Sequence, residues 1–162
     1  MDYAYEHGEG PKLGHYTPLA DFGLDVLYNV ASGTPFTPTN VYDEVNQNNL
    51  ASQPEGSLNS RQAPGTQEFD LKMTKTFPLA GLNLGAYVWV LNAFNTNNAI
   101  AVYSGTGSAY TTGYFNTPEG QAVASSLESE GIDPQQTYRL ALQNQSLFSI
   151  PRTVRFGLRM GF

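Results

Sequence analysis

The last nine residues, Val154-Arg155-Phe156-Gly157-Leu158-Arg159-Met160-Gly161-Phe162, alternate between apolar side chains and charged or small ones. Successive side chains of a β-strand point to opposite faces, so this segment has one wholly apolar face and one polar face. An edge strand of a soluble sandwich can show the same alternation. However, the sequence stops on an aromatic residue, and alternating segments of about ten residues are typical of transmembrane β-barrels. The segment therefore favours a barrel strand.

The same period of two recurs in three earlier segments, at residues 22–30, 68–74 and 82–91. Acidic and basic residues occupy the second face of the first two, where a dry sandwich core would not tolerate them without partners. The tail of a further strand precedes them near residue 4. We expect an all-β chain of about five antiparallel amphipathic strands, centred near residues 4, 26, 72, 87 and 157, in an open sheet.

The connections between these segments differ sharply in length. Residues 77–81 form a tight turn, whereas residues 31–66 and 92–151 are long and polar. Short turns on one side and long loops on the other are typical of outer-membrane barrels, which predicts extracellular long loops. Within the last loop, Thr117 and Pro118 predict a helix from residue 118 to about residue 130, and no other substantial helix is expected.

Composition narrows the function classes. Only 14% of the residues are charged, the net charge is −6, and Lys and Arg together number eight, so no basic patch for nucleic acid is available. The absence of Cys excludes disulfides and thiolate metal sites. Residues 1–7 carry neither a basic nor an apolar leader region. For an exported barrel, this pattern predicts that the 162 residues are a fragment.

Five blocks in order carry a family resemblance: ASGTPFTP (31–38), FDLKMTKTF (69–77), VWVLNAFN (88–95), TPEGQ (117–121) and PRTVRFGLR (151–159). Together they resemble the C-terminal region of Oar-like TonB-dependent receptors, whose N-terminal part is similar to a carboxypeptidase-regulatory domain. The resemblance implies a plugged barrel of about 22 strands. It also implies energy coupling through TonB, which would contact only the missing N-terminal region.

The resulting hypothesis assigns residues 1–162 to the C-terminal portion of such a barrel, in the bacterial outer membrane. Signal peptide, plug and most of the barrel would lie outside these residues. The ending resembles the signal that the barrel-assembly machinery recognises, carried by Val154, Phe156, Leu158, Met160 and Phe162. These side chains would also face outer-membrane lipid. Two alternatives remain open: a small outer-membrane adhesin or structural barrel, and a soluble β-sandwich module that binds carbohydrate.

A set of charged residues falls on the polar rows of the expected strands, which would face the barrel lumen. They are Asp25, Glu68, Asp70, Lys72, Arg155 and Arg159. Three roles are open to them: pairing across strands, contact with the missing plug, or contact with a substrate. Aromatic residues of the last loop are candidates for ligand capture, for an interfacial girdle or for a loop core. They are Tyr103, Tyr110, Tyr114 and Phe115.

No catalytic, metal or cofactor site is predicted. His7 and His15 lie in a Gly/Pro-rich turn without Cys support, which favours solvated residues over a metal site. No Gly-x-Ser-x-Gly elbow exists, so we do not expect an enzyme. The carboxylates Asp43, Glu44 and Glu55 lack the dense spacing of a calcium loop.

Overall fold

The structure is a computed structural model that describes all residues except 16, 41–52, 80 and 162. The chain divides into two compact units. The first, here called the sheet unit, comprises Met1–Val30, Gln67–Thr96 and Ile150–Phe162. The second, here called the loop unit, comprises Ala31–Thr66 and Asn97–Ser149.

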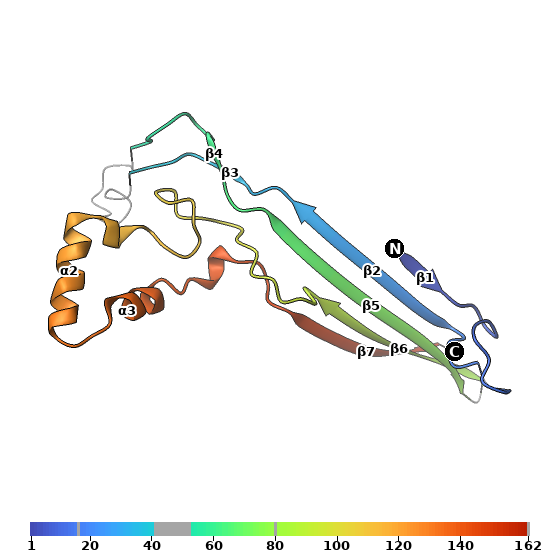
Figure 1. The fold of residues 1–162 in the computed structure, drawn as a ribbon. Coiled ribbons are helices and arrows are strands. Elements are labelled where there is room, and N and C mark those ends of the chain that lie inside the picture. The colour runs from blue at the N-terminus through green and yellow to red at the C-terminus, as the bar shows by residue number, and fades with distance from the viewer. Residues whose placement is uncertain (16, 41–52, 80, 162) are drawn as a thin grey trace. The chain divides into compact units, whose positions relative to one another are not determined.

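An antiparallel five-stranded sheet forms the sheet unit, with its strands in the order β1-β2-β5-β6-β7 (Figure 1). Its strands are β1 (Asp2–Ala4), β2 (Phe22–Ala31), β5 (Thr66–Leu79), β6 (Leu82–Leu91) and β7 (Thr153–Gly161). The sheet is open, because β1 and β7 each have a single neighbour among the strands that the structure describes. The predicted number, direction and position of the strands are confirmed.

The register of the sheet assigns each side chain to a face. Met73 lies opposite Val88 and Val88 opposite Phe156, while Lys72 lies opposite Trp89 and Trp89 opposite Arg155. Directly opposite residues of an antiparallel pair share a face. The apolar rows of β5, β6 and β7 therefore form one face, continuous except at Lys75 opposite Ala86, and the alternate rows form the other face.

The two long connections attach to strand ends at the same end of the sheet. The first residues of β5 lie beside the last residues of β6, since Leu71 pairs with Val90, and Leu91 in turn pairs with Thr153 of β7. The opposite end of β5 and β6 is joined by a tight turn, in which Gly81 has a φ of 85°. The predicted alternation of short and long connections along the chain is confirmed.

The first long connection contains a short strand pair that the sequence did not predict. Here β3 (Pro35–Phe36) pairs antiparallel with β4 (Arg61–Gln62). Gly33 precedes it, and a Cβ atom there would lie 1.8 Å from the carbonyl oxygen of Ala63. Only glycine allows this approach of the two backbones, so Gly33 fixes the start of the pair.

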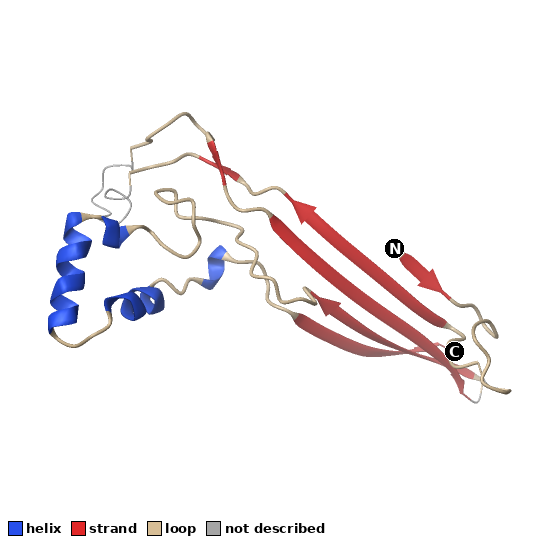
Figure 2. Cartoon of the chain, viewed as in Figure 1, coloured by secondary structure: helices blue, strands red, loops and turns tan. Residues whose placement is uncertain are grey.

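The helices of the described residues all belong to the chain segment that connects β6 to β7, and Figure 2 draws them in blue. They are η1 (Tyr114–Asn116), α2 (Pro118–Ser129), α3 (Pro134–Ala141) and η2 (Gln145–Leu147). The predicted helix is α2, and the Thr117 hydroxyl accepts the N–H of Gly120 as its cap. The expectation of no further helix is wrong. Asp133 caps α3 by accepting the N–H groups of Gln135 and Gln136, and Pro134 occupies its first turn.

Buried apolar side chains are few and small. Among the described residues they are Ala20 and Leu91 in the sheet unit and Ala63, Ala99 and Ala109 in the loop unit. A soluble domain normally buries Leu, Ile, Val and Phe in a common core. The described residues of the sheet unit form no such core on either face, so its large apolar side chains remain partly or fully exposed.

Candidate functional site

The apolar face of the sheet is the largest chemical feature of the sheet unit. On β7 its side chains are strongly exposed: Phe156 is 83% exposed and Leu158 is 75% exposed. Its other members on β5, β6 and β7 are Phe69, Leu71, Met73, Phe77, Leu82, Leu84, Ala86, Val88, Val90, Val154 and Met160. Contiguous apolar surface of this kind marks a contact with a partner or a membrane.

Aromatic side chains lie toward the two ends of this face on β5. Phe69 lies at the end that bears the long connections and Phe77 near the tight turn, with the aliphatic residues Leu71 and Met73 between them. Eight residues separate the two rings, which is about 27 Å along a strand. The face therefore has an aromatic residue at each margin of β5.

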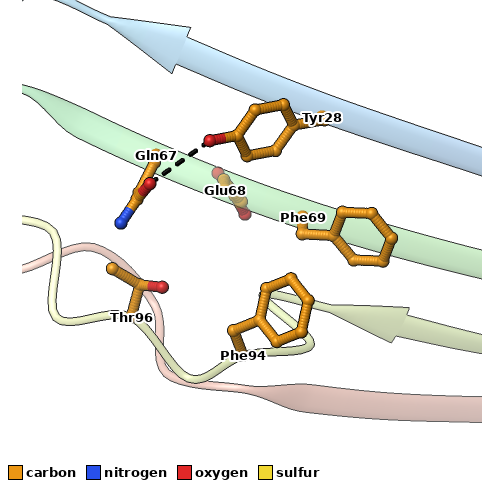
Figure 3. A pocket seen from close by; sticks show the side chains of 6 residues that line it. All are labelled: Tyr28, Gln67, Glu68, Phe69, Phe94 and Thr96. Carbon is orange, nitrogen blue, oxygen red and sulfur yellow. Dashed lines mark hydrogen bonds between the residues drawn. The ribbon is translucent and has the colours of Figure 1, made fainter.

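The aromatic residues at the long-connection end form a small open pocket of about 490 Å³ (Figure 3). The ring of Phe69 lies 4.9 Å from that of Phe94 and 6.4 Å from that of Tyr28. The Tyr28 hydroxyl donates a hydrogen bond of 3.2 Å to Oε1 of Gln67. Figure 3 shows the amide of Gln67 and Thr96 at one end of the pocket and the phenyl rings at the other. The pocket is amphipathic.

Lys75 interrupts the apolar face of β5 near the tight turn. Its Nζ donates a hydrogen bond of 3.1 Å to the carbonyl oxygen of Pro18 and another to that of Ala20. The same ammonium lies 5.6 Å from the centre of the Phe77 ring. The charge thus sits at the margin of the face while its alkyl chain lies along it, as in a snorkelling lysine.

The polar face carries the charged residues predicted for it, in cross-strand rows. Lys72 Nζ lies 4.0 Å from Asp25 Oδ2, and both side chains are about half exposed. In the same row, the Arg155 guanidinium lies 5.5 Å from the centre of the Trp89 ring. Exposed ion pairs contribute little to stability, typically about 0–1 kcal/mol. The row therefore organises charge on this face more than it stabilises the sheet.

The remaining charged residues are not joined into one network. Asp70 Oδ1 accepts the backbone N–H of Asn92 at 2.9 Å, so it fixes a turn. Arg159 lines an open hollow of about 420 Å³ with Tyr87 and Trp89. Among the described residues, neither Arg155 nor Arg159 lies within 4.0 Å of a carboxylate. Pairing across strands thus accounts for Asp25 and Lys72 alone.

Gly157 gives the polar face a close aromatic contact with β7. The Tyr87 ring lies across it, and a Cβ atom on Gly157 would be 2.5 Å from Cε1 of that ring. Tyr87 and Gly157 are directly opposite in the register. The small residues of the polar row therefore make room for the large rings of β6.

A buried asparagine missed by the sequence analysis closes the long-connection end of β6. Asn92 is 1% exposed, with a positive φ of 49°. Its Nδ2 donates to the carbonyl oxygens of Thr96 and Ile150, at 3.0 and 3.2 Å, and its Oδ1 accepts the N–H of Thr96 at 2.9 Å. Asn95 adds a bond by accepting the N–H of Arg152. The repeated Asn after an apolar strand is a signal for such a turn, since Asn tolerates this backbone conformation.

The loop unit contains a second pocket, of about 450 Å³. Tyr110 and Phe148 form one wall, with ring centres 5.1 Å apart, and α3 forms another. Of the aromatic loop residues singled out from the sequence, Tyr110 alone lines it. Phe115 packs against Tyr138 at 4.6 Å and Tyr114 against Phe115 at 5.9 Å, which makes them part of a loop core.

The Tyr138 hydroxyl anchors α3 to the segment before η1. Its oxygen accepts the backbone N–H groups of Thr112 and Tyr114, at 3.1 and 3.3 Å, and lies 2.6 Å from the Thr112 hydroxyl. Partial burial alone would raise the pKa of Tyr138, but the hydrogen bonds from Thr111, Thr112 and Tyr114 outweigh it and lower the pKa below its ordinary value. The oxygen is thus held where negative charge is favoured.

The His and carboxylate residues considered from the sequence as possible metal ligands do not come together in the described part of the chain. His7 Nδ1 lies 2.9 Å from Asp21 Oδ2 at the exposed surface. Asp43, Glu44 and the terminal Phe162 lie outside the described residues. Within the described part of the chain, no three His, Asp or Glu side chains gather as a metal ion would require. No helix in that part has the length and apolar character needed to cross a membrane.

Comparison with known proteins assigns no family. No family model matches the chain, and it matches neither a curated protein nor a solved structure.

Proposed function

We propose that the five strands are a section of a transmembrane β-barrel in a bacterial outer membrane, belonging to a TonB-dependent receptor. The observation that carries the proposal is the continuous apolar face, on which Phe156 and Leu158 of β7 are strongly exposed. The opposite face carries Asp25, Lys72 and Arg155, which suit a water-filled lumen. A barrel wall requires this combination of faces.

The dimensions of the apolar face support a bilayer as its partner. Strands in such barrels tilt by about 35–45° from the membrane normal. The roughly 27 Å between Phe69 and Phe77 along β5 then corresponds to a height of about 21 Å. Barrels expose an apolar band about 25 Å tall with aromatic girdles at both margins. Phe69 and Phe77 occupy the places of such girdles.

The edges of the sheet decide how much of a barrel these residues supply. Unpaired backbone groups of an edge strand cost several kcal/mol each in hydrocarbon, so a sheet in a bilayer must close. Known barrels of this type have at least eight strands. On this proposal, strands from outside the 162 residues complete the barrel beside β1 and β7. The plug and the contact with TonB also belong to those other parts.

Single cysteines along β7 test the proposal, because the chain has no Cys of its own. Each residue from Val154 to Met160 is replaced in turn by Cys in the complete polypeptide, which is folded into lipid vesicles and spin-labelled. Collisions with oxygen, which concentrates in lipid, and with a water-soluble nickel chelate are then measured. We expect oxygen access at positions 154, 156, 158 and 160 and chelate access at 155, 157 and 159.

The two sets of positions are controls for each other, since they alternate on one strand. A soluble sandwich would bury the even positions under a second sheet, and they would then be shielded from both reagents. Chelate access at Phe156→Cys would refute the membrane assignment, because that position lies midway between the aromatic margins.

A further inference from the structure

The pocket of the loop unit combines apolar and polar groups on one side of α3. Gln135, Tyr138, Arg139 and Leu142 all line it. Spacings of three and four residues bring these side chains to one face of the helix. Tyr110 and Phe148 face them, and Tyr110 is 60% exposed. The volume of about 450 Å³ falls in the range of small-molecule sites, roughly 300–1,000 Å³.

Arg139 is the one charged residue among those that line the pocket. It is the single Lys or Arg between residues 97 and 149, a segment that also holds Glu119, Glu128, Glu130 and Asp133. Among the described residues, its guanidinium has no hydrogen-bond or ion-pair partner, although Asp133 stands on the same helix cap. An unpaired guanidinium offers a planar fork of donors that matches a carboxylate.

We propose that this pocket binds an acidic saccharide, a pyranose ring that carries a carboxylate. The carboxylate pairs with Arg139, and the C–H face of the ring packs on Tyr110 or Phe148. The amides of Gln135 and Gln143, which also line the pocket, exchange hydrogen bonds with the ring hydroxyls. Each of the three kinds of lining group then has a partner in one ligand.

Other small ligands leave part of the lining unused. A neutral sugar provides no partner for Arg139, and an aromatic acid provides no hydroxyl for the amides of Gln135 and Gln143. A pocket that presents polar groups discriminates against ligands that leave those groups unpaired. The inference goes beyond the proposed function and is independent of it, because every lining residue belongs to the loop unit.

Binding is tested with the full 162-residue chain, in buffer or in detergent micelles if it needs them. The probes are trigalacturonate, the neutral trigalactose of the same linkage, and triglutamate, and isothermal titration calorimetry measures their affinities. We expect trigalacturonate to bind at least tenfold more tightly than trigalactose. Added salt should narrow this difference, since the pocket is open and its charge is screened.

Variants assign the contacts. Arg139→Gln should weaken trigalacturonate binding about tenfold and leave trigalactose unchanged, whereas Tyr110→Ala should weaken both. Arg139→Lys keeps the charge without the fork and should fall between the wild type and Arg139→Gln. The matched control is Arg61→Gln, which removes an exposed cation of the same unit that does not line the pocket. Far-UV circular dichroism verifies that each variant keeps its helices.

Three results overturn the inference. The first is no heat of binding with trigalacturonate at millimolar concentration by a chain whose circular dichroism shows it to be folded. The second is an equal loss of affinity in Arg61→Gln and Arg139→Gln. The third is triglutamate binding as tightly as trigalacturonate, which would make the site a charge-selective peptide site. The cysteine scan of β7 is unaffected by any of them, so failure here is distinct from failure of the membrane proposal.

Discussion

Substituting Phe156 by Arg separates a lipid-facing sheet from a water-facing one by the size of its effect. Phe156 lies opposite Val88, which lies opposite Met73. Met73 is four residues from both Phe69 and Phe77, the aromatic margins of the face on β5. Phe156 therefore shares the register of the middle of the apolar band on β5, and a strand tilt of about 40° moves its height by about 6 Å from that middle, which keeps it inside the band.

The expected cost follows from this depth. Arg at the bilayer midplane of a barrel costs about 2–4 kcal/mol, and near the interface about 0–1 kcal/mol. If water covered the face instead, replacing an 83% exposed side chain would change stability by only about 0.5 kcal/mol in either direction. The cost of Phe156→Arg therefore differs between lipid and water by roughly 2 kcal/mol or more, which is about thirtyfold in the unfolding equilibrium constant.

The assay is reversible guanidinium unfolding of the complete barrel from lipid vesicles, followed by tryptophan fluorescence. Val154→Arg, two residues nearer the margin, should cost less than Phe156→Arg. Thr74→Arg is the matched control, because it lies opposite Tyr87 on the polar face and next to Met73, which shares the register of Phe156. A cost below about 0.5 kcal/mol for Phe156→Arg, or a cost equal to that of Thr74→Arg, would refute the assignment of this face to lipid.

Further substitutions test the packing. Asn92→Ala removes the partners of the Thr96 N–H and of two carbonyl oxygens; it should cost at least about 3 kcal/mol in chemical denaturation, and a loss below 1 kcal/mol would contradict the role of this side chain. Gly157→Ala places a Cβ atom against the Tyr87 ring and should lower the free energy of unfolding by about 1–3 kcal/mol. Adding Tyr87→Ala to this variant should recover part of that loss. Strictly additive losses would show that the two side chains do not touch. Tyr138 should ionise below the ordinary tyrosine value of about 10 in an alkaline absorbance titration, and Tyr138→Phe should remove that component. Because the pKa of Tyr138 is lowered in the folded chain, its ionisation stabilises the fold. This stabilisation is full above the unfolded-state pKa of about 10 and is lost as pH falls through the folded-state pKa. An unchanged titration of Tyr138→Phe would contradict the hydrogen-bond geometry.

The sequence predicted the strands well because the period of two is a local property. Each alternating segment defines its own two faces, so the face of Lys72 or of Phe156 follows from its neighbours in the chain. The partner of a charge does not follow, since it depends on register. Arg155 lies beside Trp89 because of the offset between β6 and β7, which no single strand encodes.

The features that were missed depend on contacts between distant residues. Asn92 is buried because Thr96 and Ile150 converge on it, and Ile150 lies 58 residues away. The loop pocket joins Tyr110, α3 and Phe148, which share no periodic pattern. By contrast, the sequence does contain a signal for α3. Asp133-Pro134 repeats the N-cap and proline pattern of Thr117-Pro118, from which only α2 was predicted.

The hydrogen bonds of Asn92 join the two ends of the connection that runs from Thr96 to Ile150. Nδ2 of Asn92 donates to the carbonyl oxygens of both Thr96 and Ile150. The point where the chain leaves the sheet is therefore tied to the point where it returns. On the proposal that the sheet is part of a barrel, a different binding loop inserted between residues 97 and 149 would leave the strands of the wall unchanged.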